Sequence, residues 1–291
     1  MSLLVAVKSC EFDRDRGAHS LIRETWGKDV VEGDLKFFTA RPGQQLIATA
    51  DPDEVIVNAP DDYAGLPYKT REIVRYALAN DYEHAFLCDT GSFVIPHHLM
   101  RCGFENFDYL GYWAMKLRTF AYVAQNSDRG CPTITIPICY PWASGGGYSL
   151  SRKAMKFVAE SEPFVWAEDL WVGQVMGQNR IKIEDKSRDG FKGFVVDWIH
   201  LEDNYKSDAM EFRRKWMQDR YERCKKLCTI EGCASPLWDE YKITHERLDP
   251  DDIEANLEAR RLRRKPVVID PAEAERIIEE RRRARGHGIP R

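Results

Sequence analysis

Short apolar runs alternate with amphipathic segments along the first two thirds of the chain. Residues 3–7 form an apolar run typical of a buried strand, and in the HSLIRETWG that follows the apolar residues recur at helical spacing. The same pattern predicts further strands at 35–39, 54–57, 84–87, 109–115, 133–138, 180–184 and 194–199, and helices at 67–80, 151–160 and 168–176. Strands that alternate with helices predict an α/β fold with a mainly parallel sheet covered on both faces.

Two stretches of this pattern are candidates for ligand binding. The polar turn in HAFLCDTGSFV lies at the carboxyl end of a predicted strand, where parallel sheets bind their ligands. The second stretch, ASGGGYSLS at 143–151, holds three consecutive glycines, each of which costs roughly 0.5–1 kcal/mol relative to alanine inside a regular element. It is a flexible connector, a tight turn, or a place where the backbone comes close to a ligand.

Composition and charge narrow the class of protein. With 43% hydrophobic residues among 291, the chain can bury a sizeable core, which excludes disordered and fibrous proteins. Its formal net charge of −4 argues against a uniformly basic nucleic-acid surface. No run approaches the roughly 18 apolar residues of a membrane helix, and the eight cysteines are scattered, as in reduced cytosolic proteins. We therefore expect a soluble, cytoplasmic protein with no membrane span.

The composition changes near residue 249. LDPDDIEANLEARRLRRK and IDPAEAERIIEERRRARG each begin with an aspartate and a proline and end in arginines, which suits both ends of a helix dipole. We expect a main domain at 1–248 and a basic helical extension at 249–291. The extension lies in solvent, packs in a homo-oligomer, or meets an anionic partner.

Five stretches, in order, resemble the signature blocks of the β-1,3-galactosyltransferase and fringe group, glycosyltransferase family 31. They are LIRETWG, DDYAGLPYKT, FLCDTGSFV, YPWASGGGYSLS and AEDLWVG, and the resemblance runs over about residues 3–200. It implies a GT-A (Rossmann-like) fold with a mainly parallel mixed sheet. It also implies an inverting hexosyltransferase that uses a nucleotide-sugar donor, usually a UDP-sugar.

The block AEDLWVG supplies the candidate catalytic residues. An inverting transferase needs one general base to take the proton of the acceptor hydroxyl, and a carboxylate on a rigid element serves this purpose. Asp169 is the first candidate for this base and Glu168 the second, because the family carries its catalytic acid in this block. The structural alternative is that both acids only cap a helix.

The other blocks supply the candidate binding residues. The resemblance places donor binding at Arg23, Asp62, Lys69, Asp89, Thr90 and Gly91, and sugar or acceptor binding at Trp142, Gly145, Gly146, Gly147 and Tyr148. Arginine can bind a phosphate as a forked donor. For Lys69 the alternative is an ordinary surface lysine, and for Trp142 it is packing beside a glycine turn.

The metal motif of the family is degenerate here. The family usually ends its strand with three acids, the last of which helps to bind a divalent ion, Mn²⁺ or Mg²⁺. The matching positions are Asp89, Thr90 and Gly91, of which glycine offers no side-chain ligand. Hard cations prefer several oxygen ligands, so a metal would bind through Asp89, His200 and the diphosphate itself.

Other interpretations stay open. Cations such as Arg23, Lys69 or Lys192 could replace the metal, or the chain could be a catalytically dead relative that binds or scaffolds nucleotide-sugars. The acceptor of an active enzyme would be a glycan, a protein, a small molecule, or a hydroxylated base in DNA. The arginines of 249–291 make a DNA acceptor physically reasonable, since phosphate contacts dominate such binding.

Overall fold

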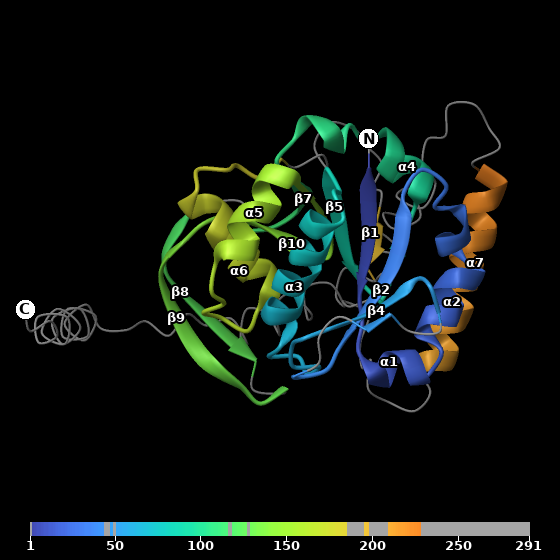
Figure 1. Cartoon of the computed structure of the whole chain (residues 1–291), viewed down its shortest axis with the longest axis horizontal. Helices are drawn as coiled ribbons and strands as arrows, with labels where there is room; N and C mark the ends of the chain where they lie inside the picture. Colours follow the sequence, from blue (N-terminus) through green and yellow to red (C-terminus); the bar gives the residue numbers. More distant parts are fainter. Residues whose placement is uncertain are drawn as a thin grey trace, which may run out of the picture. The chain divides into compact units, whose positions relative to one another are not determined.

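The central sheet has seven strands in the order β3–β4–β2–β1–β5–β10–β7 (Figure 1). The structure is a computed structural model that describes residues 2–43, 47–48, 51–115, 118–126, 129–184, 195–197 and 209–227. The predicted α/β fold with a mainly parallel mixed sheet is confirmed. None of the helices in these ranges has the length and apolarity that crossing a bilayer requires.

The parallel core of the sheet consists of strands that the apolar runs predict. It contains β1 (Leu3–Lys8), β2 (Asp34–Ala40), β4 (Glu54–Val57) and β5 (His84–Asp89). The short β3 (Ile47–Ala48) pairs antiparallel with β4 at one edge, and β10 (Trp142–Ser151) runs antiparallel between β5 and β7 (Tyr109–Met115). The register of β1 on β5 sets Lys8 opposite Asp89.

Helices cover both faces of the sheet, as predicted. On one face lie α3 (Leu66–Ala79), α5 (Arg152–Glu160) and α6 (Glu168–Gln178); on the other lie α1 (Glu11–Asp15), α2 (Ala18–Glu24), α4 (Pro96–Arg101) and α7 (Ala209–Leu227) (Figure 1). Short 3₁₀ turns at Trp26–Asp29 and Phe104–Asn106 complete the second layer. Two apolar clusters result, one on each face of the sheet.

Several expectations need correction. Residues 180–184 form no strand; only Glu184 makes a single bridge, to Leu110. The glycine-rich stretch at 143–151 is neither a connector nor a turn, because it lies inside β10, whose register against β7 shifts between Ala143 and Tyr148. The extended backbone of a strand suits glycine less than a turn does, so the pattern pointed to a loop.

Some elements were not predicted at all. These include β8 (Thr119–Asn126) and α7, whose segments carry no clear periodic signal. Strand β8 pairs with β9 (Cys131–Cys139), the strand predicted at 133–138, in a ribbon separate from the main sheet. The predicted strand at 194–199 is a short one, β11 (Val195–Asp197), paired with β6 (Ser92–Val94). The proposed domain boundary at 248/249 and the helices of 249–291 lie outside the described residues and stay predictions.

Glycines bring helix α6 very close to the chain that enters β10. A Cβ added at Gly173 would lie 2.2 Å from the Cβ and 2.9 Å from the Cα of Trp142, and one added at Gly177 would lie 2.1 Å from the ring of Tyr140. Because these glycines are four residues apart, they share one face of the helix. This close approach packs the middle and the carboxyl end of α6 against the chain that enters β10.

We expect the substitution Gly173→Ala to destabilise the protein. The new methyl meets backbone-proximal atoms of Trp142 that cannot rotate away, so overpacking should lower the free energy of unfolding by about 1–3 kcal/mol, although alanine favours a helix. Urea unfolding of the full chain measures this effect. Gln178→Ala, at an exposed position of the same helix, is the control, and equal stabilities of the two variants would contradict the close packing.

Candidate active site

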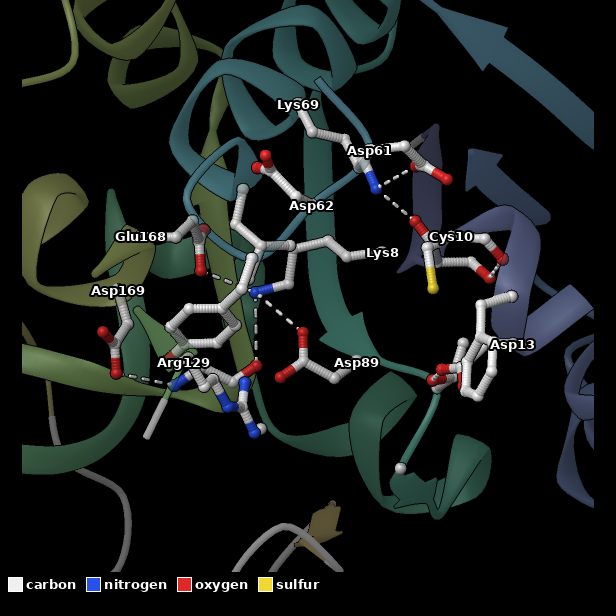
Figure 2. A pocket seen from close by; sticks show the side chains of 18 of the residues that line it. Lys8, Cys10, Asp13, Asp61, Asp62, Lys69, Asp89, Arg129, Glu168 and Asp169 are labelled. Atoms are coloured by element: carbon white, nitrogen blue, oxygen red, sulfur yellow. Dashed lines mark hydrogen bonds and ion pairs between the residues drawn. The ribbon is translucent and has the colours of Figure 1, made fainter. Parts of the chain in front are cut away.

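A cavity of about 640 Å³ opens at the carboxyl ends of β1 and β5. It lies between the helix layers where parallel sheets of this kind bind ligands, and Figure 2 shows its lining. The candidate residues that line it are Asp62, Lys69, Asp89, Thr90, Gly91, Gly145, Gly146, Glu168 and Asp169. Residues from four of the five blocks of family resemblance thus meet at one site.

Glu168 is a buried carboxylate whose oxygens are fully engaged by the protein. Oε2 accepts a hydrogen bond from the ammonium of Lys8 at 2.7 Å, and Oε1 accepts one from the hydroxyl of Thr70 at 2.9 Å. The phenol of Tyr148 also donates to Oε1, and its pKa is raised well above the ordinary value by burial and by the charge of Glu168, so it stays a donor. A carboxylate held this way is a structural anion rather than a base.

Lys8 lies at the centre of the acidic group (Figure 2). Its ammonium is buried, 3.2 Å from Oδ1 of Asp89, and it also donates to the carbonyl of Gly145 at 3.3 Å. Burial alone would lower the pKa of Lys8, but the charges of Asp89 and Glu168 outweigh burial and raise it. Lys8 is therefore a permanent cation that joins β1 to β5, β10 and α6.

Asp169 differs from its neighbour Glu168 in every respect that matters for a base. It is partly buried at the first turn of α6, where Oδ2 accepts from the amide of Gly145 at 3.2 Å and Oδ1 accepts from that of Leu170 at 2.7 Å. Burial and the charge of Glu168 raise its pKa to about 6, although these amides and Lys8 act in the opposite direction. Asp169 lines the cavity, and a raised pKa brings its carboxyl group closer to the range that suits a general base.

The metal site that the resemblance implies lies only partly within the described residues. Asp89 already pairs with the ammonium of Lys8, and Gly91 has no side chain to offer. Within the described ranges, no group of three His, Cys, Asp or Glu side chains is arranged to hold a metal ion. His200 lies outside those ranges, as does Lys192. Ligation of a metal through Asp89 and His200 therefore stays a prediction.

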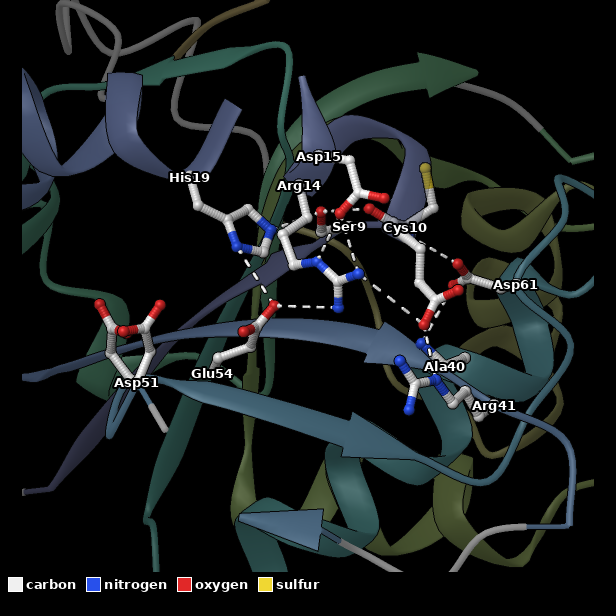
Figure 3. Close-up of polar contacts among 12 residues, drawn as sticks. Ser9, Cys10, Arg14, Asp15, His19, Ala40, Arg41, Asp51, Glu54 and Asp61 are labelled. Atoms are coloured by element: carbon white, nitrogen blue, oxygen red, sulfur yellow. Dashed lines mark hydrogen bonds and ion pairs between the residues drawn. The ribbon is translucent and has the colours of Figure 1, made fainter. Parts of the chain in front are cut away.

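A polar network behind the cavity holds its Ser9–Cys10 edge in place (Figure 3). Nε2 of His19 lies 2.7 Å from the hydroxyl of Ser9, and its Nδ1 lies 3.5 Å from Glu54. Burial, with the charges of Arg23 and Arg14, lowers the pKa of His19 to about 4. The imidazole is therefore neutral at pH 7 and can accept the Ser9 hydroxyl.

Lys69 also contacts the Ser9–Cys10 edge of the cavity, and it is not a surface lysine. Its side chain is buried, donates to Asp61 at 2.7 Å, and also donates to the carbonyl of Ser9. The second oxygen of Asp61 accepts from the amide of Glu11 at 2.7 Å. Lys69 thus lines the cavity while its charge is already compensated.

The structure does not bring the remaining candidates to the cavity. Arg23 forms an ion pair with Asp53 at 2.7 Å and lies over the ring of Phe37, away from the lining residues. Trp142 packs against α6, Gly147 is buried in β10, and Tyr148 is a core residue bonded to Glu168. Their predicted contacts with a donor or acceptor have no counterpart in this cavity.

Sequence reasoning missed two residues that matter here. Lys8 follows the first apolar run and was not proposed as a site residue. A lysine at the end of a buried strand, beside a predicted ligand site, is a signal that could have identified it. Arg213 also lines the cavity, but it comes from α7, beyond the family blocks, and no pattern pointed to it.

We expect Lys8→Met to be strongly destabilising. It leaves the buried Glu168 and the partly buried Asp89 without their counter-ion, and breaking a buried pair in this way typically costs about 3–5 kcal/mol. Lys153→Met is the control, because its pair with Asp108 is exposed and should contribute less than about 1 kcal/mol. Chemical unfolding of both variants at pH 7 compares them, and similar small losses would contradict the central role of Lys8.

Comparison with known proteins leaves the family open. No family model matches the sequence, and no curated protein matches it. Solved structures that resemble the fold include a glycosyltransferase involved in the glycosylation of the major capsid of PBCV-1, with 10% identity, a TM-score of 0.41, and coverage of 74% of this chain and 99% of that one. A second is 2-C-methyl-D-erythritol 4-phosphate cytidylyltransferase from Thermus thermophilus, with 8% identity, a TM-score of 0.38, and coverage of 75% of this chain and 98% of that one. A third is HddC from Yersinia pseudotuberculosis, with 10% identity, a TM-score of 0.37, and coverage of 77% of this chain and 98% of that one. These likenesses are too distant to assign an activity.

Proposed function

We propose that the protein is an inverting glycosyltransferase of GT-A type that moves a sugar from a nucleotide-sugar, most simply a UDP-sugar, to an acceptor hydroxyl. The observation that supports this best is the difference in environment between two adjacent carboxylates. Glu168 is engaged by three donors, whereas Asp169 faces the cavity with a pKa raised to about 6. Paired carboxylates with different environments are typical of acid–base sites.

In the proposed reaction Asp169 is the general base. Its carboxylate takes the proton of the acceptor hydroxyl while that oxygen attacks the anomeric carbon of the donor sugar. The bond from this carbon to the phosphate oxygen breaks, and the electron pair leaves with the nucleoside diphosphate. Attack from the face opposite the leaving group inverts the configuration at the anomeric carbon.

Gly145 provides the space in which the sugar would react. A Cβ at this position would lie 3.7 Å from the Cβ of Asp169 and 3.7 Å from Oδ2 of Asp89. A side chain here would therefore fill the gap between the two carboxylates. This supports the interpretation in which the glycines of β10 allow a ligand to approach, for Gly145 and its neighbour Gly146.

The acceptor is still to be identified among glycans, proteins, small molecules and modified DNA. The DNA alternative depends on 249–291, which lie outside the described residues. The alternative of a catalytically dead relative predicts binding of a nucleotide-sugar without transfer or donor hydrolysis.

The first experiment is calorimetry of the full chain with UDP-, GDP- and CDP-sugars, each with Mn²⁺ and with a chelator, followed by assays of transfer and of slow donor hydrolysis. We expect one donor class to bind, and Asp169→Asn to lower turnover by roughly 10²–10⁴-fold while leaving donor affinity nearly unchanged. Asp108→Asn, outside the cavity, is the control. No binding of any nucleotide-sugar, or full turnover by Asp169→Asn, would refute the proposal.

The pH dependence of turnover gives an independent test. The base must be ionised, so the rate should fall as the pH drops through about 6, the pKa of Asp169. A rate that is flat between pH 5 and 8 would contradict this assignment.

The raised pKa of Asp169 also predicts how the stability of the protein depends on pH. Its pKa is above the value of about 4 in an unfolded chain, so folding disfavours the ionised form, and this penalty is present above pH 6 and vanishes at low pH. Asp169→Asn should therefore be more stable than the wild type at pH 8, by roughly 1–3 kcal/mol, and nearly equal to it at pH 4. Denaturant unfolding at the two pH values measures the difference, and a destabilised variant at pH 8 would contradict the raised pKa.

A further inference from the structure

Arg213 is a buried arginine at the cavity, and two nitrogens of its guanidinium have no hydrogen-bond partner among the described residues. Its side chain is only 7% exposed, and it lines the cavity from helix α7. Among the described residues, its Nε and Nη1 have no hydrogen-bond partner. A buried guanidinium with unsatisfied donors is costly unless a ligand satisfies them.

The surroundings of Arg213 place it beside the degenerate acidic motif. Its Nη1 is 3.7 Å from Oδ2 of Asp13, too far for a hydrogen bond but close enough for an ion pair. The same oxygen of Asp13 accepts a hydrogen bond from the hydroxyl of Thr90. Arg213 therefore lies next to the turn at Thr90 and Gly91, where the family resemblance would place the metal ligand.

The other cations of the cavity are already committed. Lys8 is held by Glu168, Asp89 and the carbonyl of Gly145, and Lys69 is held by Asp61 and the carbonyl of Ser9. Arg129 lies over the ring of Tyr63 at 4.0 Å and is only partly buried, so solvent reaches it. Arg213 thus lines the site and combines burial with donors that no described residue satisfies.

We propose that Arg213 binds the diphosphate of the nucleotide-sugar and stabilises the negative charge that the leaving nucleoside diphosphate gains. The planar guanidinium can donate two parallel N–H bonds to phosphate oxygens, which is the geometry that arginine provides best. It supplies positive charge beside Asp89–Gly91, where the described residues do not form a metal site. This inference rests on the proposed function, since it assumes a nucleotide-sugar donor.

The test compares Arg213→Gln with Arg214→Gln on the same helix. Arg214 is the matched control because it is the next residue and pairs with Glu24 at 3.1 Å, and it does not line the cavity. Calorimetry of the full chain uses the nucleoside diphosphate that binds the wild type most tightly among UDP, GDP, ADP and CDP, and the corresponding nucleoside up to millimolar concentration. Each titration is run with Mn²⁺ and with a chelator.

We expect Arg213→Gln to weaken binding of the diphosphate by about 30-fold or more and to leave binding of the nucleoside within about twofold of the wild type. Arg213→Lys keeps the positive charge but loses the two parallel N–H donors, so its affinity for the diphosphate should lie between those of the wild type and Arg213→Gln. Arg214→Gln should bind the diphosphate as tightly as the wild type does. This pattern would support the role of Arg213 even if Arg213→Gln folded poorly, because Arg213→Lys tests the same contact more gently.

Other outcomes overturn the inference. Equal affinity of wild type and Arg213→Gln for the diphosphate would refute it while leaving the proposed function intact. Equal losses for diphosphate and nucleoside would show that the substitution disturbs the cavity as a whole, and would also refute it. A wild type that binds no nucleoside diphosphate would overturn both this inference and the proposed function.

Discussion

The buried charge of Glu168 is the constraint on which the site depends. A carboxylate in the interior is tolerated only when it is paired and hydrogen-bonded, and its three donors come from three different elements. Lys8 ends β1, Thr70 lies in α3, and Tyr148 lies in β10. Satisfying one anion therefore fixes the start of α6 relative to the sheet and to the helix beside it.

The position of Asp169 follows from that arrangement. Adjacent residues at the start of a helix point in different directions. Both carboxyl groups line the cavity, but Glu168 is engaged by Lys8, Thr70 and Tyr148, whereas Asp169 accepts from backbone amides. The charge of Glu168 in turn raises the pKa of Asp169. One residue holds the helix and tunes the other, which is why two neighbouring acids can have separate tasks.

Much of the fold could be predicted from the sequence because β1, β2, β4 and α3 carry strong apolar periodicity of their own. The cavity residues at 89–91 and 168–169 could be found because they lie at the ends of such elements. The strand state of 143–151 could not be predicted, since three glycines have no side chains to show a period. The strand depends on pairing of the flanking residues, with β7 at Ala143 and with β5 and β7 from Tyr148 on. Arg23 was wrongly predicted to line the site. Its ion pair with Asp53 forms only when the fold brings the two segments together, which the local sequence does not show.

The strand state of the glycines has a consequence for how the site would recognise its ligands. Gly145 and Gly146 lie inside β10 between the paired residues Ala143 and Tyr148, and side chains hold their backbone. The amide of Gly145 donates to Asp169, its carbonyl accepts from Lys8, and the carbonyl of Gly146 accepts from the hydroxyl of Ser92. A loop of glycines would lose conformational entropy each time it closed on a ligand, whereas this backbone is ordered beforehand. Selectivity for the sugar would then be set by the size of a rigid gap, and residue 145 could adjust it without displacing the base.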